Sequence, residues 1–470
     1  MAHALRLGKR TDVDMTTGSI AANLLRFALP LMVGNLFQQL YNMVDTWVIG
    51  QTGDTAAYAA VGSVGPITNI LIGFFTGLAS GAGVVISQYY GAKKYDQVSK
   101  AAHTAMVMTL LLGVLFTLIG VLGTPLILNL MLPGEETKAV FEFGRTYLTI
   151  YFAGVLGLMV YNMGAGILRA IGDSNRPFYF LIVSSLTNIA LDLFFVFGPW
   201  KMGVEGVALA TVIAQWVSAL LTIVVLLRST TCVQIFWNRL RMDMAILRQI
   251  IRIGIPAAIQ MAITAFSNVF VQSYVAGVNT DATYCLAGWT SYSKIDHFIF
   301  LPVQSISLAV MTFVGQNLGA GDVPRARRGT WIGYLIGTAS AVCIIVPVML
   351  FAPQLAPVFN SDPKVVHYAV MLLRTITPFY MLCSVNQVLA ASLRGAGNTR
   401  APMIIMISTF VGFRQLYLFL VSNFVSNEIL PLAMGYPAGW FACCVCFVLY
   451  YRHYRFGKNS VVQSTKEGVR

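Results

Sequence analysis

Two stretches of this sequence place polar side chains at helical spacing inside otherwise apolar runs, and each series ends in an aspartate. Members three or four residues apart lie on the same face of a helix, so each series would form one polar face. The members are Gln38, Tyr41, Asn42 and Asp45 in the first series, and Ser184, Ser185, Asn188 and Asp192 in the second. A third run adds Thr211 and Gln215, which are four residues apart.

The oxygen atoms of these side chains could bind a cation. Hard cations prefer carboxylate, amide and hydroxyl oxygens, which Asp45, Asn188, Asp192 and Thr211 would supply together. If a metal ion binds there, we expect Na⁺. Alternatively, one carboxyl carries a proton, because burial and a neighbouring carboxylate both favour the protonated form. The plainer interpretation is a polar seam that hydrogen bonds hold together between helices.

The composition indicates which elements must position these residues. Of 470 residues, 57% are hydrophobic and only 10% are charged, and the mean hydropathy is +0.72. An average soluble domain is about 25% charged, and a disordered chain has far less apolar mass. Seven cysteines are too few for a disulfide scaffold of this length. We therefore predict an all-α polytopic membrane protein.

Twelve apolar runs are long enough to cross a bilayer, which takes about 20 residues. They lie near 24–50, 57–90, 101–123, 139–168, 177–198, 203–227, 247–278, 283–317, 329–350, 364–393, 401–424 and 430–451. If the first run leads outward, Asp45 lies about 30 Å along it, and Asp192 lies about 22 Å along the fifth. Both aspartates would then occupy the outer half of the membrane.

The basic residues predict the orientation. The net charge is +13, and with a cytoplasmic N-terminus 24 of the 31 Lys and Arg fall in inner segments. The outer loops then hold only Lys138, Lys201 and Lys364. By the positive-inside rule both termini are cytoplasmic, and a bacterial inner (plasma) membrane is the expected location. The basic excess therefore needs no nucleic acid as a partner. Residues 1–23 carry no apolar segment of a signal peptide, and we find no lipidation motif.

The chain also repeats itself. Three groups of residues in the first half have counterparts in the second half. The first group is Leu168-Arg169, Gly172-Asp173-Ser174 and Pro177, which corresponds to Leu393-Arg394, Gly397-Asn398-Thr399 and Pro402. The second match is Pro30 with Pro256, and the third is Gln88 and Gly91-Ala92 with Gln316 and Gly319-Ala320. The offsets are 225, 226 and 228 residues. We predict two six-helix bundles, 24–228 and 247–452, with tails 1–23 and 453–470 and a linker 229–246. Six is even, so the repeats are parallel and related by a pseudo-twofold axis along the membrane normal. A cleft between two such bundles suits alternating access.

Eight residues inside the spans are candidates for lining this cleft or for gating it. Four belong to the polar faces described above, namely Gln38, Tyr41, Asn42 and Gln215, and the other four are Pro30, Asn162, Asp296 and Arg414. Asp296 and Arg414 lie at similar depths, about 20 Å along their spans, so they could pair. Such a pair could equally be structural, since an unpaired charge in a membrane is costly. Pro30 could be a bending point of the first span or a static kink. Asn162 in the fourth span is grouped with these lining candidates.

Several segments of this sequence resemble the motifs of a known protein family. Leu168-Arg169-Ala170-Ile171-Gly172-Asp173-Ser174 with Pro177, and Leu393-Arg394-Gly395-Ala396-Gly397-Asn398-Thr399-Arg400 with Pro402, resemble the loop signature of multidrug and toxic compound extrusion (MATE) transporters. Val314-Gly315-Gln316-Asn317-Leu318-Gly319-Ala320-Gly321 resembles the end of the family's eighth helix, and Asn42, Asp45 and Asn188 to Asp192 also resemble family positions. The resemblance covers roughly 20–455.

The resemblance implies a secondary exporter of organic cations and other amphipathic drugs, in exchange for H⁺ or Na⁺. Spans 7 and 10 hold no Asp or Glu, so the acids of spans 1 and 5 resemble the DinF-like branch. Asp45, Asn188 and Asp192 then match coupling positions residue by residue, and Thr211 matches more loosely. The implied partners are small drug-like molecules and membrane lipid, and we expect a monomer without cofactors other than the coupling ion.

Other functions stay open at this point. The sequence has no G-x-x-x-x-G-K-[ST], H-E-x-x-H or G-x-S-x-G motif, so an enzyme is not expected. A lipid-linked oligosaccharide flippase of the same superfamily would carry more buried Lys and Arg. An exporter of one metabolite is a variant of the main interpretation, and a receptor or scaffold would not need Asp45 and Asp192.

Overall fold

The computed structural model describes residues 13–131, 138–458 and 460–462, and these residues form helices and loops without strands. Twelve helices among them are long and apolar enough to cross a membrane, as predicted. The first six are α1 (Ile20–Gln51), α2 (Thr55–Gly91), α3 (Tyr95–Met131), α4 (Lys138–Ala170), α5 (Asn175–Phe197) and α6 (Val204–Arg228). A short 3₁₀ helix, η2 (Trp237–Arg239), follows in the linker.

The second six spans contain more breaks than the first. Spans 7, 8 and 9 are the single helices α7 (Met244–Ala276), α8 (Ala282–Gly319) and α9 (Val323–Leu350). Span 10 consists of α11 (Pro363–Ile376), η4 (Thr377–Phe379) and α12 (Tyr380–Gly395), and span 12 consists of α15 (Ile429–Ala433) and α16 (Gly435–His453). Span 11 is divided into α13 (Arg400–Met406), η5 (Ile407–Phe413), α14 (Arg414–Leu420) and η6 (Val421–Val425). Short α10 (Ala352–Leu355) and η3 (Ala356–Val358) lie between α9 and α11. The segments η5 and η6 are π-helical, a geometry that is frequent at functional sites.

The predicted repeat is visible in the helix boundaries. Span 4 (Lys138–Ala170) and span 10 (Pro363–Gly395) are offset by 225 residues at both ends, and so are span 6 (Val204–Arg228) and span 12 (Ile429–His453). Residues at this offset therefore hold equivalent places in the two halves.

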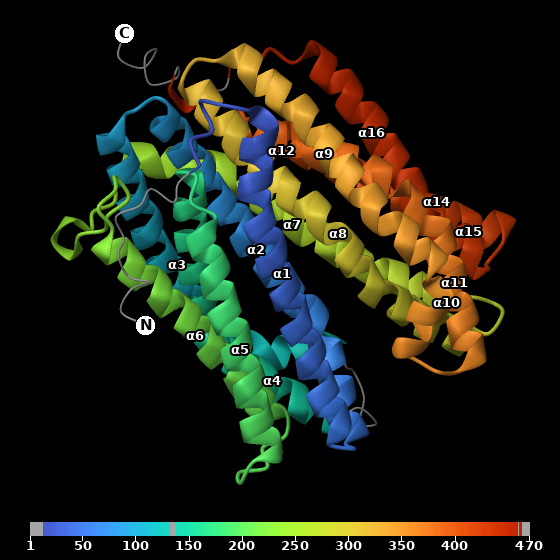
Figure 1. Ribbon diagram of the computed structural model, residues 1–470. Coiled ribbons are helices and arrows are strands. Elements are labelled where there is room, and N and C mark those ends of the chain that lie inside the picture. The colour runs from blue at the N-terminus through green and yellow to red at the C-terminus, as the bar shows by residue number, and fades with distance from the viewer. Residues whose placement is uncertain (1–12, 132–137, 459, 463–470) are drawn as a thin grey trace. The chain divides into compact units, whose positions relative to one another are not determined.

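The contacts divide the described chain into two compact units (Figure 1). Among the described residues, unit 1 contains Val13, 30–131 and 138–252, and unit 2 contains 14–29, 253–458 and 460–462. The predicted bundle boundaries were 24 and 228. The difference at the linker arises because Phe236 N donates to His103 Nε2 at 3.0 Å and Asp243 N to Thr104 Oγ1 at 3.1 Å, which binds the linker to α3.

The start of α1 groups with unit 2 because polar contacts anchor the segment before it. Asn317 Nδ2 donates to Met15 O at 3.0 Å, and Met15 is fully buried. Arg325 Nη2 donates to the carbonyls of Thr17 and Gly18, both at 2.9 Å. Asn317 belongs to the segment 314–321 that resembles the family, so part of that motif serves to hold the N-terminal segment.

In unit 1, α4 packs against α2, α3 and α6, and most of its residues are buried. Glycines allow the close approach of α6: a Cβ on Gly154 would lie 2.3 Å from Val212 Cγ1, and one on Gly157 would lie 3.1 Å from the Trp216 ring. Small residues serve helix packing in membranes in this way. In contrast, α1 and α7, the first helix of each repeat, pack least extensively among the long helices.

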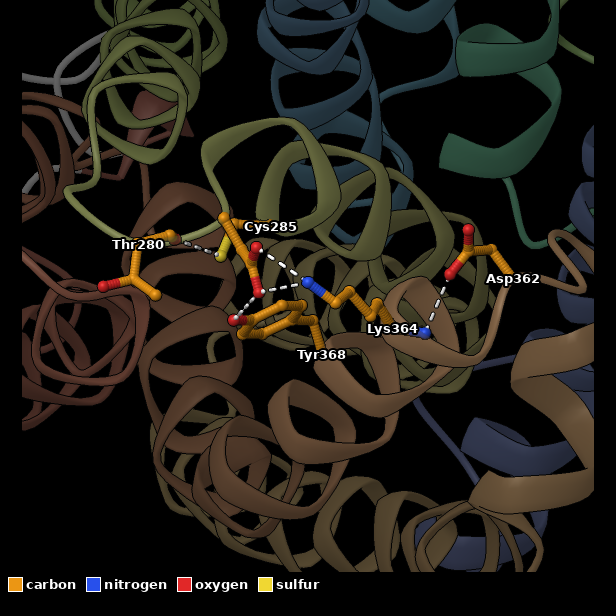
Figure 2. A network of polar contacts seen from close by, with 6 residues as sticks. Thr280, Cys285, Asp362, Lys364 and Tyr368 are labelled. Carbon is orange, nitrogen blue, oxygen red and sulfur yellow. Dashed lines mark hydrogen bonds and ion pairs between the residues drawn. The ribbon is translucent and has the colours of Figure 1, made fainter.

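In unit 2, α8 packs against α9, α11 and α12. A polar network joins the loop before α8 to the start of α11 (Figure 2). Lys364 Nζ lies 3.1 Å from Asp281 Oδ1, and the Tyr368 hydroxyl donates to Asp281 Oδ2 at 3.2 Å. Cys285 Sγ donates to Thr280 O at 3.5 Å. This network fixes one end of α8 and α11.

Candidate cation site

The four residues predicted to bind a cation come together in unit 1. Asp45 lies on α1, Asn188 and Asp192 on α5, and Thr211 on α6. The Thr211 hydroxyl lies 3.0 Å from Val207 O and 3.5 Å from Asp45 Oδ2, two acceptors for its single proton, and Asp192 and Asn188 lie beside the same Asp45 carboxyl group. Three helices thus supply two carboxyls, one amide and one hydroxyl to one place.

This group is buried, and its polar atoms are incompletely paired. The exposed fractions are 7% for Asp45, 1% for Asn188 and 0% for Asp192. Asp45 Oδ1, both oxygens of Asp192 and both amide atoms of Asn188 make no hydrogen bond to the described residues. Buried polar groups are nearly always paired, and two adjacent buried carboxylates repel each other. A shared proton or a bound monovalent cation would satisfy both requirements.

Two tyrosines of α4 complete the site, and the sequence analysis did not identify their role. Tyr147 and Tyr151 are stacked, with ring centroids 6.3 Å apart and an interplanar angle of 11°. The hydroxyl of Tyr147 lies against Thr211, and that of Tyr151 lies against Gln215. Their spacing of four residues, which places both rings on one face of α4, is a signal that could have found them.

The other predicted residues of unit 1 have varied surroundings. Gln38 contacts the Tyr41 hydroxyl, and Tyr41 lies near Asp45. The side chain of Asn42 is exposed, and its carbonyl accepts from Thr46. Asn162 Nδ2 donates to the carbonyl of Leu158 within α4.

Several local features position these side chains. Ser184, in the polar series of α5, donates to Ala214 O on α6 at 2.8 Å and so holds the two helices together. Gly154 and Gly157 face Val212 and Trp216, which directly follow Thr211 and Gln215. Pro30 lies inside α1 at the residue where the helix passes from unit 2 to unit 1.

In unit 2, Asp296 and Arg414 do not form the predicted ion pair. The Asp296 Oδ1 atom accepts hydrogen bonds from Tyr292, at 2.8 Å, and from Tyr380. Arg414 Nη2 donates instead to Ser267 Oγ at 2.8 Å and to Asn268 Oδ1 at 3.0 Å. Equal depth along two helices does not make their side chains face each other, so the prediction of a pair was wrong.

The donor set decides which ions fit the unit 1 site. Within 13–131, 138–458 and 460–462, no group of three or more His, Cys, Asp or Glu is placed to hold a metal. The two carboxyls, amide and hydroxyl of the site are hard oxygen and nitrogen groups with at most two negative charges. They fit a proton or a monovalent hard cation such as Na⁺.

Comparison with known proteins agrees with this architecture. The family model MatE matches residues 30–194 and again 256–419, once in each repeat. A probable multidrug resistance protein YoeA from Bacillus subtilis is 31% identical over 440 residues, covering 92% of each chain. A probable multidrug resistance protein NorM from Thermotoga maritima is 26% identical over 462 residues, covering 96% of each.

The fold is also that of a solved transporter. A MOP superfamily transporter from Pyrococcus furiosus superposes with a TM-score of 0.88 at 23% identity, covering 94% of this chain and 97% of that one. The fold and the relatives together define a multi-pass membrane transporter. This chain belongs to the MatE family, as the resemblance of its motifs implied.

Proposed function

We propose that this protein is a secondary active multidrug exporter, which exchanges organic cations and other amphipathic drugs for H⁺ or Na⁺ by alternating access. The observation that carries the proposal is the buried carboxyl pair Asp45 and Asp192, whose oxygens are mostly without hydrogen-bond partners. The names of the relatives YoeA and NorM support multidrug resistance as the biological role.

The coupling step follows from the chemistry of the pair. Two adjacent buried carboxylates cannot both stay charged without a compensating proton or cation. A proton on either aspartate, or Na⁺ held by Asp45, Asp192, Asn188 and Thr211, would supply that compensation. Loading the site therefore draws α1, α5 and α6 together, and unloading it lets the carboxylates separate.

Helix α1 is suited to respond to this step. It carries Asp45, it packs less extensively than most helices, and Pro30 removes one of its backbone hydrogen bonds. Residues 14–29 group with unit 2, whereas α1 from Pro30 onward groups with unit 1. We propose that Pro30 is the bending point through which the ion site changes access to the substrate cleft.

Energetics favour more than one coupling ion for a charged drug. One charge moving through 100 mV releases about 2.3 kcal/mol, which sustains roughly a 50-fold gradient of a neutral substrate. Exchange of one monovalent cation for one monovalent drug moves no net charge. We therefore expect a stoichiometry above one, or a chemical ion gradient, and reversal potentials distinguish these cases.

The experiment that tests the proposal is ethidium efflux from proteoliposomes under an imposed Na⁺ or H⁺ gradient. Wild type is compared with Asp45→Asn and Asp192→Asn, and Glu142→Gln serves as the control for an exposed acid of α4. We expect one gradient to drive efflux, both aspartate variants to lose at least nine tenths of the rate, and the control to retain it.

Two results would contradict the proposal. Full gradient-driven efflux in both folded aspartate variants would remove the pair from the coupling mechanism. No efflux by folded wild type with ethidium and other cationic drugs would instead indicate a dedicated metabolite exporter or a flippase.

A further inference from the structure

The linker between the two repeats, residues 229–246, exposes apolar and basic side chains together. Trp237 and Met244 are each 66% exposed, which is high for large apolar side chains in one short segment. Arg239 and Arg241 are also exposed, and neither forms a salt bridge with a described residue. We call these four residues the linker surface, and the proposed transport cycle does not use it.

The single acid of the linker is engaged elsewhere. Asp243 Oδ1 accepts from Ala245 N at 2.9 Å and from Ile246 N at 3.1 Å, so this carboxylate caps the start of α7. The guanidinium carbon of Arg239 lies 5.2 Å from the centroid of the Phe236 ring, which carries no charge. The linker therefore offers positive charge that its own residues do not neutralise.

Buried side chains and backbone hydrogen bonds hold the linker in a defined position on unit 1. Val233 is fully buried and Ile235 is 6% exposed. Ile235 N donates to Leu226 O of α6 at 3.0 Å. The exposed side chains of the linker surface thus follow a segment that is packed against the transmembrane helices.

The contacts of the linker with α3 give its depth in the membrane. Two backbone N–H groups of the linker donate to the side chains of His103 and Thr104. The exposed Leu, Val and Ile side chains of α3 begin at Leu111 and end at Leu126. Centred on this run, the roughly 20 residues that cross the hydrocarbon core are about 109–128. His103 and Thr104 then lie about 8 Å beyond the core, at the depth of the lipid headgroups.

The linker surface has the chemistry of a lipid interface at that depth. Trp237 and Met244 directly follow Phe236 and Asp243, the two residues that donate to α3. Tryptophan is enriched at membrane–water interfaces, where its ring is apolar and its N–H can be solvated. Guanidinium groups form paired, charge-assisted hydrogen bonds with phosphate. Apolar and basic side chains combined in this way are typical of segments that bind anionic membrane surfaces.

We propose that the linker surface binds the phosphate groups of anionic phospholipids through Arg239 and Arg241, while Trp237 and Met244 contact the lipid chains. This binding goes beyond the proposed transport cycle, because it attaches the connection between the repeats to the membrane surface. The lipid supplies the negative charge that the linker lacks. A zwitterionic lipid carries its own ammonium group and therefore binds less tightly. A water-soluble acidic partner would gain nothing from an exposed tryptophan at headgroup depth.

The test is quenching of Trp237 fluorescence in vesicles that contain the full-length protein. The vesicles are phosphatidylcholine with a small fraction of lipid brominated near the headgroup, either phosphatidylglycerol or phosphatidylcholine. The signal of Trp237 is the difference between each protein and the same protein with Trp237→Phe. For wild type at low salt, we expect brominated phosphatidylglycerol to quench roughly twofold more than brominated phosphatidylcholine. Raising the salt to about 0.5 M should remove most of this preference, because salt screens exposed charges.

Matched variants separate the charge of the linker from the charge of the protein. Arg239→Gln with Arg241→Gln should abolish the preference, whereas Arg239→Lys with Arg241→Lys should retain most of it. Lys138→Gln with Arg145→Gln, which removes two exposed charges at the other end of α4, should equal wild type. Unfolding midpoints show that each variant is folded, and Trp237→Tyr provides a second subtraction.

Three results would overturn the proposal. The first is equal quenching by the two brominated lipids in wild type, and the second is a wild-type preference in the folded double Gln variant. The third is a Trp237 that neither lipid quenches, which would indicate that a protein partner or a second copy covers the linker. Efflux does not enter this measurement, so its outcome is independent of the proposed function.

Discussion

At the scale of single residues, hydroxyl groups determine how the acids of this transporter are held. The Thr211 hydroxyl lies 3.5 Å from Asp45 Oδ2 in unit 1, while Tyr292 and Tyr380 donate to Asp296 in unit 2. None of these acids forms a salt bridge within the described residues. Neutral donors orient a carboxylate without neutralising its charge.

Replacing Thr211 by Val should impair coupling without unfolding the protein. The change keeps the shape of the side chain and removes the hydroxyl beside Asp45, so we expect gradient-driven ethidium efflux to fall by roughly 3- to 10-fold, about 1 kcal/mol. Thr211→Ser should retain most of the rate. Thr222→Val on the same helix, whose hydroxyl donates only to Ser218 O among the described contacts, is the matched control. An unchanged rate in Thr211→Val would show that this donor is dispensable.

Asp14 gives a pH-dependent contribution to stability in the segment before α1. Partial burial alone would raise the pKa of Asp14, but hydrogen bonds from Thr16 and Thr17 and the charge of Arg325 together lower it. A depressed pKa in the folded state contributes stability above the unfolded pKa of about 3.9, which is lost as the pH falls through the folded value.

Asp14→Asn should therefore be less stable than wild type at pH 7, and the difference should shrink steadily below pH of about 4. Unfolding midpoints in detergent measured between pH 3 and 7 check this expectation. A difference that stays constant over the whole range would show that hydrogen bonding alone, without charge, explains the role of Asp14.

At the scale of helices, close packing of α4 against α6 places Thr211 and Gln215. A Cβ on Gly154 would lie 2.3 Å from Val212, the neighbour of Thr211. Glycine is needed here because of this close approach rather than because of its backbone flexibility. The polar site therefore depends on a packing contact that contains no polar atoms.

Gly154→Val should push α6 away from α4 and disturb the ion site. Overpacking of this kind costs about 1–3 kcal/mol, so we expect a lower unfolding midpoint together with reduced coupled efflux. Gly123→Val on α3 is the matched control, because a Cβ at Gly123 meets no atom within 4 Å. Equal effects of the two substitutions would show that the close approach of α4 and α6 is unimportant.

At the scale of the whole molecule, the two repeats carry different side chains at equivalent helix positions. Thr211 and Gln215 of unit 1 correspond to Tyr436 and Trp440 of unit 2. Duplication of one six-helix plan thus provides two similar halves, and substitution at these positions gives them different side-chain chemistry.

The orientation of the chain in the membrane remains a prediction, with both termini in the cytoplasm. In a variant without native cysteines, Lys201→Cys should react with a membrane-impermeant maleimide added to intact cells. Arg239→Cys, also on an exposed side chain, should react only after the membrane is permeabilised. The opposite labelling pattern would show that the charge asymmetry of the loops was misinterpreted.

Much of the fold followed from the sequence because its determinants are local. The length of an apolar run and a helical period of 3.6 residues determine a membrane span, so all twelve spans could be predicted. The repeat was visible in Leu168-Arg169 and Leu393-Arg394, and the helical spacing in α1 and α5 brought out Asp45, Asn188 and Asp192. These features depend on residues only a few positions apart.

Only the tertiary structure decided which helix faces meet. Tyr147 joins the ion site, Asp296 binds tyrosines rather than Arg414, and residues 14–29 group with unit 2. The direction in which a side chain points around a helix becomes a contact only when a neighbouring helix packs there. That packing depends on small residues such as Gly154 and on hydrogen bonds between distant segments, which no local pattern in the sequence encodes.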